Sequence, residues 1–181
     1  DDVQYLGSGE NDFAINLSNG ATWTGNSTGG VDLDVILSDG GAWTGYHEDE
    51  TGNTLSMEIK KGAIWTNTAK ENDATTINSL SGNGGYIQMS DKTGTHLNVE
   101  QYSGNTTIMY NHDEKTPTNI LGGDVTIKAA TAGSNITLHT DSIGTSKQEE
   151  VKKVLDALAQ KLTYTNHTDG NLTGTVQILE G

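Results

Sequence analysis

The chain has 181 residues and a formal net charge of −14 at pH 7, and all ten of its basic residues are lysine. This balance argues against nucleic-acid binding, which needs cationic side chains against phosphate, and against docking on anionic lipid. Hydrophobic residues make up only 32% of the chain, and its apolar runs are too short for a segment to span a bilayer. The chain has no cysteine and therefore no disulfide, which fits a bacterial exterior better than an animal extracellular module.

A repeat dominates the first third of the chain. It reads as an aliphatic residue, two polar residues, Gly, a small residue, any residue, Trp and Thr, and it occurs at 17–24, 37–44 and 59–66. All three tryptophans, Trp23, Trp43 and Trp65, fall on this pattern, and a weaker fourth copy is expected from Leu80 to Tyr86. A unit of this length cannot bury its own apolar face, so we expect units that stack with like residue on like.

Alternating strands lead into each repeat. Apolar residues at every second position from 31 to 37 alternate with Asp32 and Asp34, which is the pattern of a half-buried strand. The glycine after the last aliphatic residue predicts a turn, and the tryptophan strand follows it. The tryptophans are expected to form one ladder of the stack, and a second ladder is expected from Leu17, Leu37 and Ile59.

Further alternating strands follow between residues 87 and 138 without the tryptophan pattern. Glycine-rich turn signals are expected to separate these strands, at 82–85, 103–105, 122–124 and 133–135. We expect residues 1–141 to form the stacked units.

A helix is predicted over 147–162. Ser146 and Glu149 have the spacing of a capping box, and apolar residues then recur at helical intervals from 151 to 162. A final pair of strands, 162–165 and 173–179, flanks a turn. We expect residues 142–181 to pack on or cap the stacked units within the same domain.

Two segments carry a family resemblance. Gly-Ala-Thr-Trp-Thr at 20–24 follows an aliphatic strand, and the segment 86–99 combines an Asp-Lys pair, a Gly-x-His turn and a second alternating strand. Both are similar to the pertactin-like passenger domains of bacterial autotransporters, the type V secretion family. The resemblance covers residues 11–111, and the helix departs from it.

The resemblance implies an all-β fold, a right-handed parallel β-helix of about 20–22 residues per coil. It also implies a secreted rod at the outer-membrane surface of a Gram-negative bacterium, active in adhesion, aggregation or biofilm. It carries over no catalytic residues, because the chain lacks the Gly-Asp-Ser-Gly motif of the serine-protease passengers.

Two acidic clusters, 47–50 and 112–114, each include a histidine. Neither has the spacing of an EF-hand or of a glycine-rich calcium-binding repeat, so we expect solvated loop charge. A loose Ca²⁺ site at either cluster is the open alternative, and no metal or cofactor site is assigned. His96 and His139 lie opposite apolar neighbours in strand-like segments and are expected to face outward.

Carbohydrate chemistry is a second open question. Asp32 and Asp34 project from one strand face about 7 Å apart, a separation compatible with a glycosidase pair. The absence of arginine weakens a lyase mechanism. The tryptophans are expected in the core rather than as a sugar platform, whereas Tyr46, Tyr102 and Tyr110 are expected to be partly exposed.

The sequence thus predicts a non-enzymatic, monomeric surface protein that contacts a host or bacterial cell-surface protein or glycan. The connections at 46–54, 66–76 and 111–119 are the expected presenting elements. A purely structural stalk and a carbohydrate-active enzyme using Asp32 and Asp34 are the alternatives.

Overall fold

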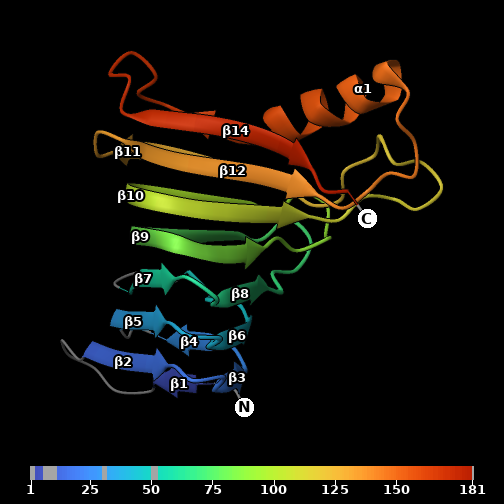
Figure 1. Ribbon diagram of the computed structural model, residues 1–181. Helices are drawn as coiled ribbons and strands as arrows, with labels where there is room; N and C mark the ends of the chain where they lie inside the picture. The colour runs from blue at the N-terminus through green and yellow to red at the C-terminus, as the bar shows by residue number, and fades with distance from the viewer. Residues whose placement is uncertain (1–2, 6–11, 30–31, 50–52, 181) are drawn as a thin grey trace.

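The computed structural model describes residues 3–5, 12–29, 32–49 and 53–180, and it is mostly β with one short helix (Figure 1). The helix, α1 (Gln148–Ala159), lies within the predicted range. The strands are β1 (Val3–Tyr5), β2 (Asp12–Leu17), β3 (Thr22–Thr24), β4 (Ser27–Gly29), β5 (Asp32–Leu37), β6 (Ala42–Gly45), β7 (Thr54–Lys60), β8 (Ile64–Asn67), β9 (Ala74–Gln88), β10 (His96–Tyr110), β11 (Asp124–Ala130), β12 (Ser134–Thr140), β13 (Leu162–Tyr164) and β14 (Leu172–Ile178).

A large parallel sheet dominates the fold. It contains 12 strands, and each ladder between its named strands is parallel. Neighbouring strands pair residues that lie one sequence repeat apart, since Phe13 pairs with Leu33 and Leu33 pairs with Leu55. The same pattern continues in β9 and β10, where Ile77 pairs with Val99. The ladder therefore has the periodicity that the tryptophan spacing predicts.

The sheet has two walls. The first wall consists of β2, β5, β7, the first halves of β9 and β10, β11 and β13. The second consists of β3, β6, β8, the second halves of β9 and β10, β12 and β14. Figure 1 shows these strands one above another, from β2 and β3 at the bottom to β14 near the top. We call one segment of the first wall, together with the segment of the second wall that follows it in the chain, a layer.

The three tryptophans form the ladder that the repeat predicts. Trp23 pairs with Trp43, and Trp43 pairs with Trp65. Their rings stack with centroids 4.8 and 4.9 Å apart and interplanar angles of 5° and 9°. Trp43 and Trp65 are fully buried, and their indole N–H groups donate to the carbonyl oxygens of Gly25 and Gly45 at 2.9 and 3.1 Å. The two inner indoles are core residues with satisfied polar groups.

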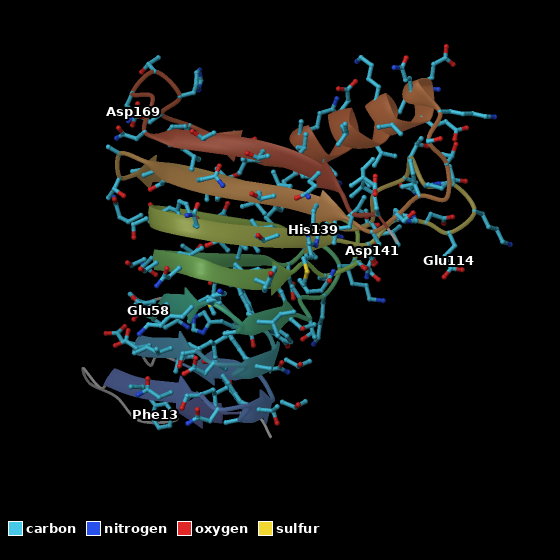
Figure 2. The ribbon with its side chains drawn as sticks, viewed as in Figure 1. Phe13, Glu58, Glu114, His139, Asp141 and Asp169 are labelled. Carbon is cyan, nitrogen blue, oxygen red and sulfur yellow. The ribbon has the colours of Figure 1, made fainter. Side chains whose placement is uncertain are left out.

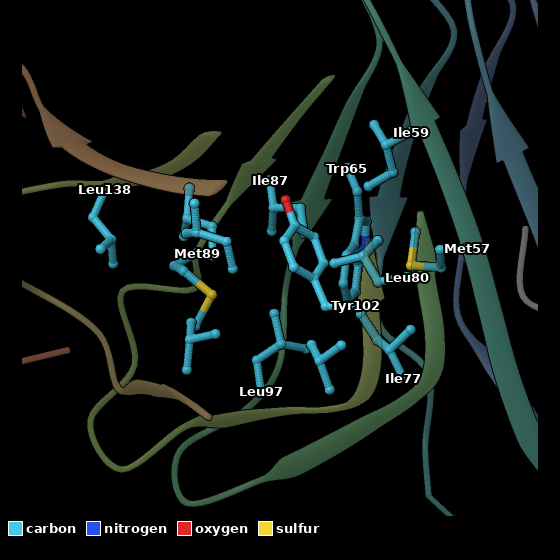
Figure 3. Packing of buried hydrophobic residues seen from close by; sticks show 14 of the residues in the cluster. Met57, Ile59, Trp65, Ile77, Leu80, Ile87, Met89, Leu97, Tyr102 and Leu138 are labelled. Atoms are coloured by element: carbon cyan, nitrogen blue, oxygen red, sulfur yellow. The ribbon is translucent and has the colours of Figure 1, made fainter. Parts of the chain in front are cut away.

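The predicted aliphatic ladder is also confirmed. Leu17 pairs with Leu37, and Leu37 pairs with Ile59, whose side chain is fully buried. Figure 3 shows Trp65 among aliphatic and methionine side chains that come from strands far apart in the sequence. Removal of this apolar surface from water is the main stabilising contribution to such a core.

In each of the first two repeats, a tight turn joins the aliphatic strand to the tryptophan strand. Asn19 and Gly20 have φ values of 52° and 75°, and Asp39 and Gly40 have 45° and 77°. Positive φ at both central positions favours Asn or Asp followed by Gly. The two turns are stacked, because the Gly20 N–H donates to the Asp39 carbonyl oxygen at 3.0 Å.

Two predicted turns lie inside strands instead. The prediction that residues 82–85 and 103–105 separate strands is wrong, because β9 and β10 continue through them. Gly104 has a φ of 88°, and a Cβ atom on it would lie 1.9 Å from the Gly82 carbonyl oxygen. These glycines permit a close approach between layers where the strands pass from one wall to the other.

The predicted fourth repeat is out of register. Ile87, not Tyr86, pairs with Trp65, and Leu80 pairs with Met57. The ladder between β7 and β9 contains an irregularity that shifts the pairing. The spacing from Leu80 to Tyr86 is therefore kept in the sequence without placing Tyr86 in the tryptophan row.

Helix α1 confirms the apolar stripe but not its predicted cap. The N-cap residue is Lys147, which makes no side-chain cap hydrogen bond, so the capping box between Ser146 and Glu149 is wrong. The helix begins one residue too late for that pairing. Val154 and Leu158 are fully buried in the core, and α1 packs against β14 and β12.

The two terminal strands extend the existing ladder. β13 pairs in parallel with β11, and β14 pairs in parallel with β12, so the two do not pair with each other. Residues 162–178 therefore add a further layer to the same sheet, with α1 in the connection that precedes it.

Candidate functional site

The candidate site is a cleft of about 410 Å³ at the edge where three connections leave the sheet. Asp91 follows β9, residues 111–114 follow β10, and Asp141 follows β12. These strands are neighbours in one parallel ladder, so their carboxyl ends meet at the same edge (Figure 2). We call this feature the acidic cleft. It is lined by Asp91, Asn111, His112, Asp113, Glu114, Leu121, Thr140 and Asp141.

Hydrogen bonds orient two carboxylates of the acidic cleft. The Asn111 Nδ2 group donates to Asp91 Oδ1 at 2.9 Å. Asp113 Oδ1 accepts the backbone N–H groups of Lys115 and Thr116 at 2.8 and 2.9 Å. Among the described residues no lysine side chain lines the cleft, so its four carboxylates face no ammonium group from that part of the chain. Carboxylates gathered in this way attract positively charged groups.

His112 bridges two connections of the cleft. Its Nδ1 lies 3.0 Å from the Asp113 carbonyl oxygen, and its Nε2 lies 3.2 Å from the carbonyl oxygen of Ser142. Since a carbonyl oxygen only accepts hydrogen bonds, the ring nitrogen that carries the proton is the donor in such a contact. The imidazole thereby holds the connection after β10 against the connection after β12.

Thr140 is a buried polar group at the cleft. Its side chain has no exposed surface, and its hydroxyl has no hydrogen-bond partner in the part of the chain that the structure describes. Thr140 ends β12 and pairs with Tyr110 in the ladder. Buried hydroxyls are usually paired, so an unsatisfied buried hydroxyl on a residue that lines a cleft is an unused hydrogen-bonding group.

Two tyrosines are buried, contrary to prediction. Tyr102 and Tyr110 are 1% and 2% exposed, because both point into the interior between layers. The Tyr110 hydroxyl donates to the Gly123 carbonyl oxygen at 2.8 Å. Burial raises the pKa of the Tyr102 phenol to about 12 and also raises the pKa of Tyr110.

His139 differs from its predicted position. The sequence predicts that it faces outward like His96; His96 is exposed, but His139 is only 6% exposed. It lies near the end of β12, in the row between Met109 and Gln177. Alternation determines the face of a strand but not whether other elements cover that face. Burial lowers the pKa of His139, and the neighbouring Asp141 carboxylate acts in the opposite direction.

The first acidic cluster is partly built into the fold. His47 is 1% exposed, and its Nδ1 lies 3.1 Å from the Ser27 hydroxyl. Asp49 Oδ1 accepts the backbone N–H of Thr76 at 2.9 Å, and Glu50 lies outside the described residues. The segment 46–49 therefore includes structural residues as well as solvated charge.

The described residues of the two acidic clusters do not bring three metal-ligating side chains together. Within residues 3–5, 12–29, 32–49 and 53–180, no group of three or more His, Asp or Glu side chains is placed to hold a metal ion. Ca²⁺ requires six to eight oxygen ligands, so binding by residues 47–49 or 112–114 would need further ligands beside their own side chains.

The carboxylate pair considered for carbohydrate chemistry occupies the outer face of β5. Asp32 Oδ1 accepts a hydrogen bond from the Thr54 hydroxyl at 2.8 Å, whereas Asp34 is exposed beside a shallow groove of about 240 Å³. Glu58 of β7 lines the same groove, and Asp32 does not. The structure therefore places Asp34 with Glu58, a neighbour that single-strand spacing could not identify.

The tryptophans offer no extended sugar-binding platform. Trp43 and Trp65 have no exposed surface, and Trp23 is half-buried with its ring stacked on Trp43. Core packing of the ladder is confirmed for the two inner rings.

The sequence did not single out Asp91, Thr140 or Asp141 as site residues. Each lies at or just beyond the end of a strand of the parallel ladder. In the sequence, each of these residues follows or ends an alternating segment. That position predicts that they share one edge of the sheet only when the register between the strands is known.

No protein-family model matches this chain, and no curated protein or solved structure is similar enough to count as a match. Among the described residues, no helix has the length and apolar composition that a membrane span requires.

Proposed function

We propose that the chain is a right-handed parallel β-helix of the kind found in autotransporter passengers, and that it acts as a non-enzymatic adhesive rod. The observation that carries this proposal is the parallel ladder, which pairs residues one sequence repeat apart and stacks the tryptophans on the same period. A chain that places one segment on each wall in every layer, with parallel ladders between its named strands, is typical of a β-solenoid.

The filled interior supports a scaffold rather than an enclosed catalytic chamber. The core contains aromatic and aliphatic side chains from every layer between β5 and β12, and most polar side chains of the strands are on the outer faces. Coils of this kind keep a constant cross-section while connections of different length leave their edges. The connections are thus the natural place for recognition.

The proposed location is the surface of a Gram-negative bacterium, outside the cell. The proposed partner is a cell-surface protein or glycan, contacted through the connections at 46–54, 66–76 and 111–119. The acidic cleft supports this assignment, because part of its lining comes from the third of these connections.

Binding to cells tests the proposal directly. The folded chain, labelled with a fluorophore, should bind saturably to epithelial cells or to co-aggregating bacteria, and a heat-unfolded sample should not. Replacement of residues 111–119 by a Gly-Ser linker of equal length should reduce binding, while circular dichroism checks that the β structure is kept. Equal binding by folded and unfolded samples, or none by either, would contradict an adhesive role and favour a stalk.

A further inference from the structure

The acidic cleft has a charge imbalance that the rest of the described chain does not correct. Its four carboxylates come from Asp91, Asp113, Glu114 and Asp141. The three salt bridges among the described residues all involve other acids, on β7, β10 and α1. In a chain with a net charge of −14, carboxylates from three connections therefore converge with no salt-bridge partner in the described part of the chain. A ligand with a positive charge would relieve their mutual repulsion.

Thr140 supplies a second and independent indication of a ligand. Thr140 lines the cleft, and its buried hydroxyl has no hydrogen-bond partner among the residues that the structure describes. Repulsion between the carboxylates does not account for the missing partner of this hydroxyl, because a hydroxyl is neutral. It is a free hydrogen-bond acceptor beside four negative groups, which suits a cationic ligand that is also a hydrogen-bond donor.

The spread of the carboxylates favours an organic cation over a metal ion. No three of the acidic or histidine side chains in the described part of the chain are placed to hold a metal. The cleft volume of about 410 Å³ is also larger than a single coordination site requires. A ligand with a charged end and an extended body fits this arrangement better.

An ammonium group fits the free oxygens of Asp91 and Asp113 better than a guanidinium group. Asp91 and Asp113 each already use Oδ1 as an acceptor for a hydrogen bond within the chain. A planar guanidinium binds best to both oxygens of one carboxylate, whereas an ammonium donates three separate hydrogen bonds. The half-buried Leu121 offers an apolar surface for the aliphatic stem of a lysine.

We propose that the acidic cleft binds a lysine side chain of a partner protein, with the ammonium held among Asp91, Asp113, Asp141 and the hydroxyl of Thr140. This inference rests on the proposed function, because it identifies what the connection at 111–119 would recognise. It differs from a general attraction of the acidic chain for cations, because it assigns binding to one edge of the sheet.

A titration followed by nuclear magnetic resonance locates the binding. The probe is the peptide acetyl-Gly-Lys-Gly-amide, added to the ¹⁵N-labelled chain in about 150 mM salt so that weak surface attraction is screened. We expect saturable shifts in the amide signals of residues 111–114 and of Asp141. The same peptide with its lysine acetylated should give none, and shifts spread evenly over the chain would overturn the proposal.

Matched variants distinguish binding at the acidic cleft from a general effect of the net charge of the chain. The double variant Asp91→Asn/Asp141→Asn should bind the peptide about tenfold more weakly, since two charge-assisted contacts are lost. The control Asp34→Asn/Asp39→Asn removes the same charge from β5 and the turn after it, and it should bind like the parent chain. Equal losses in the two double variants would overturn the proposal.

Thr140→Val tests the hydroxyl without opening a cavity. The variant should keep the thermal stability of the parent chain, because the hydroxyl has no partner among the described residues of the unliganded protein. It should bind the peptide about threefold more weakly, as expected for loss of one hydrogen bond. Unchanged affinity would overturn the proposed site.

Two further probes test competing ligands. Ca²⁺ alone and a tetramer of glucosamine are titrated under the same conditions. Tighter binding of either at residues 111–114 would overturn the assignment to a partner protein. Cell binding by the Asp91→Asn/Asp141→Asn variant keeps the two proposals distinguishable: normal cell binding with loss of peptide binding would leave the adhesive role intact and overturn this inference.

Discussion

The tryptophan layers and the later layers solve the same packing problem with different residues. In β3, β6 and β8, one row is filled by three stacked indoles. From β9 onward the same row continues as Ile87, Ile108 and Leu138, each pairing with its neighbour in the ladder. The row is continuous in space although the last tryptophan of the sequence is Trp65.

This difference shows that register, not residue identity, defines the layer. Stacked indoles add ring contacts and indole hydrogen bonds to their buried area, whereas aliphatic rows depend on area and close packing alone. The last layers also use α1, whose Val154 and Leu158 reach into the core. Stability should therefore depend on burial within each row, and the following variants compare the two regions on that basis.

The largest effect is expected in the tryptophan row. Trp43→Ala should lower the free energy of unfolding by about 3–5 kcal/mol, because it empties a fully buried site between two stacked rings. Trp23→Ala should cost clearly less, since that ring is half-buried. Urea unfolding followed by circular dichroism measures both. Equal losses would contradict the importance of burial within the row.

The helix offers the corresponding test in the later layers. Leu158→Ala should cost about 2–5 kcal/mol, because the Leu158 side chain is fully buried in the core. Leu155 on the same helix is half-buried, so Leu155→Ala serves as the control and should cost less. If the Leu158→Ala chain unfolds at the same urea concentration as the parent, α1 contributes little to the stability of the last layers.

Two glycines distinguish the effect of close approach between layers on stability from the effect of backbone strain. Gly104 and Gly133 have similar φ values of 88° and 83°, but only the first would place a Cβ against a neighbouring carbonyl. Gly104→Ala should cost about 1–3 kcal/mol more than Gly133→Ala, the usual cost of overpacking. Thermal unfolding of the two variants gives the comparison. Similar midpoints would show that conformational strain alone explains the requirement for glycine at 104.

The smallest effect concerns pH. Because burial lowers the pKa of His139 in the folded chain, the unfolded chain binds a proton more readily below the ordinary histidine value of about 6.5. The contribution of His139 is thus complete above that pH and is lost as the pH falls. In the acid range, His139→Gln should reduce the slope of the free energy of unfolding against pH by at most about 1.4 kcal/mol per pH unit, which is the slope for one proton.

His96→Gln is the control for this measurement, because His96 is exposed. Urea unfolding at several pH values between neutrality and the acid range determines the slope for each chain. An identical pH dependence for the parent and for His139→Gln would show that burial of this histidine does not couple to folding.

Much of the core was predictable because it repeats with a period that the sequence shows. Stacking of Trp43 and Trp65, the row from Leu17 to Ile59, and the apolar stripe of α1 follow from spacing alone. Such patterns specify which face of an element is buried, and like positions then meet in adjacent layers.

The remaining features depend on register and on what covers a face. Glycine at 104 reads as a turn in the sequence, but it also permits close approach within a strand. His139 lies on the predicted face and is nevertheless buried. Asp91, Asp113 and Asp141 line one cleft because three strands end at one edge of the sheet. Their separation in the sequence does not indicate that they are close in space.

The fixed register of the parallel ladder also limits how the chain can change in length. Asp32 pairs with Thr54 and Leu33 with Leu55, so the two strands are offset by one whole repeat. Deletion of residues 33–54 would place Leu55 directly after Asp32, so that Leu55 would pair with Phe13 as Leu33 does now. Loss of a single residue within a strand would instead turn the following side chains of that strand to the opposite face. Within the strands, insertions and deletions are therefore tolerated best in whole layers, so the stacked part of the chain changes in length by one layer at a time.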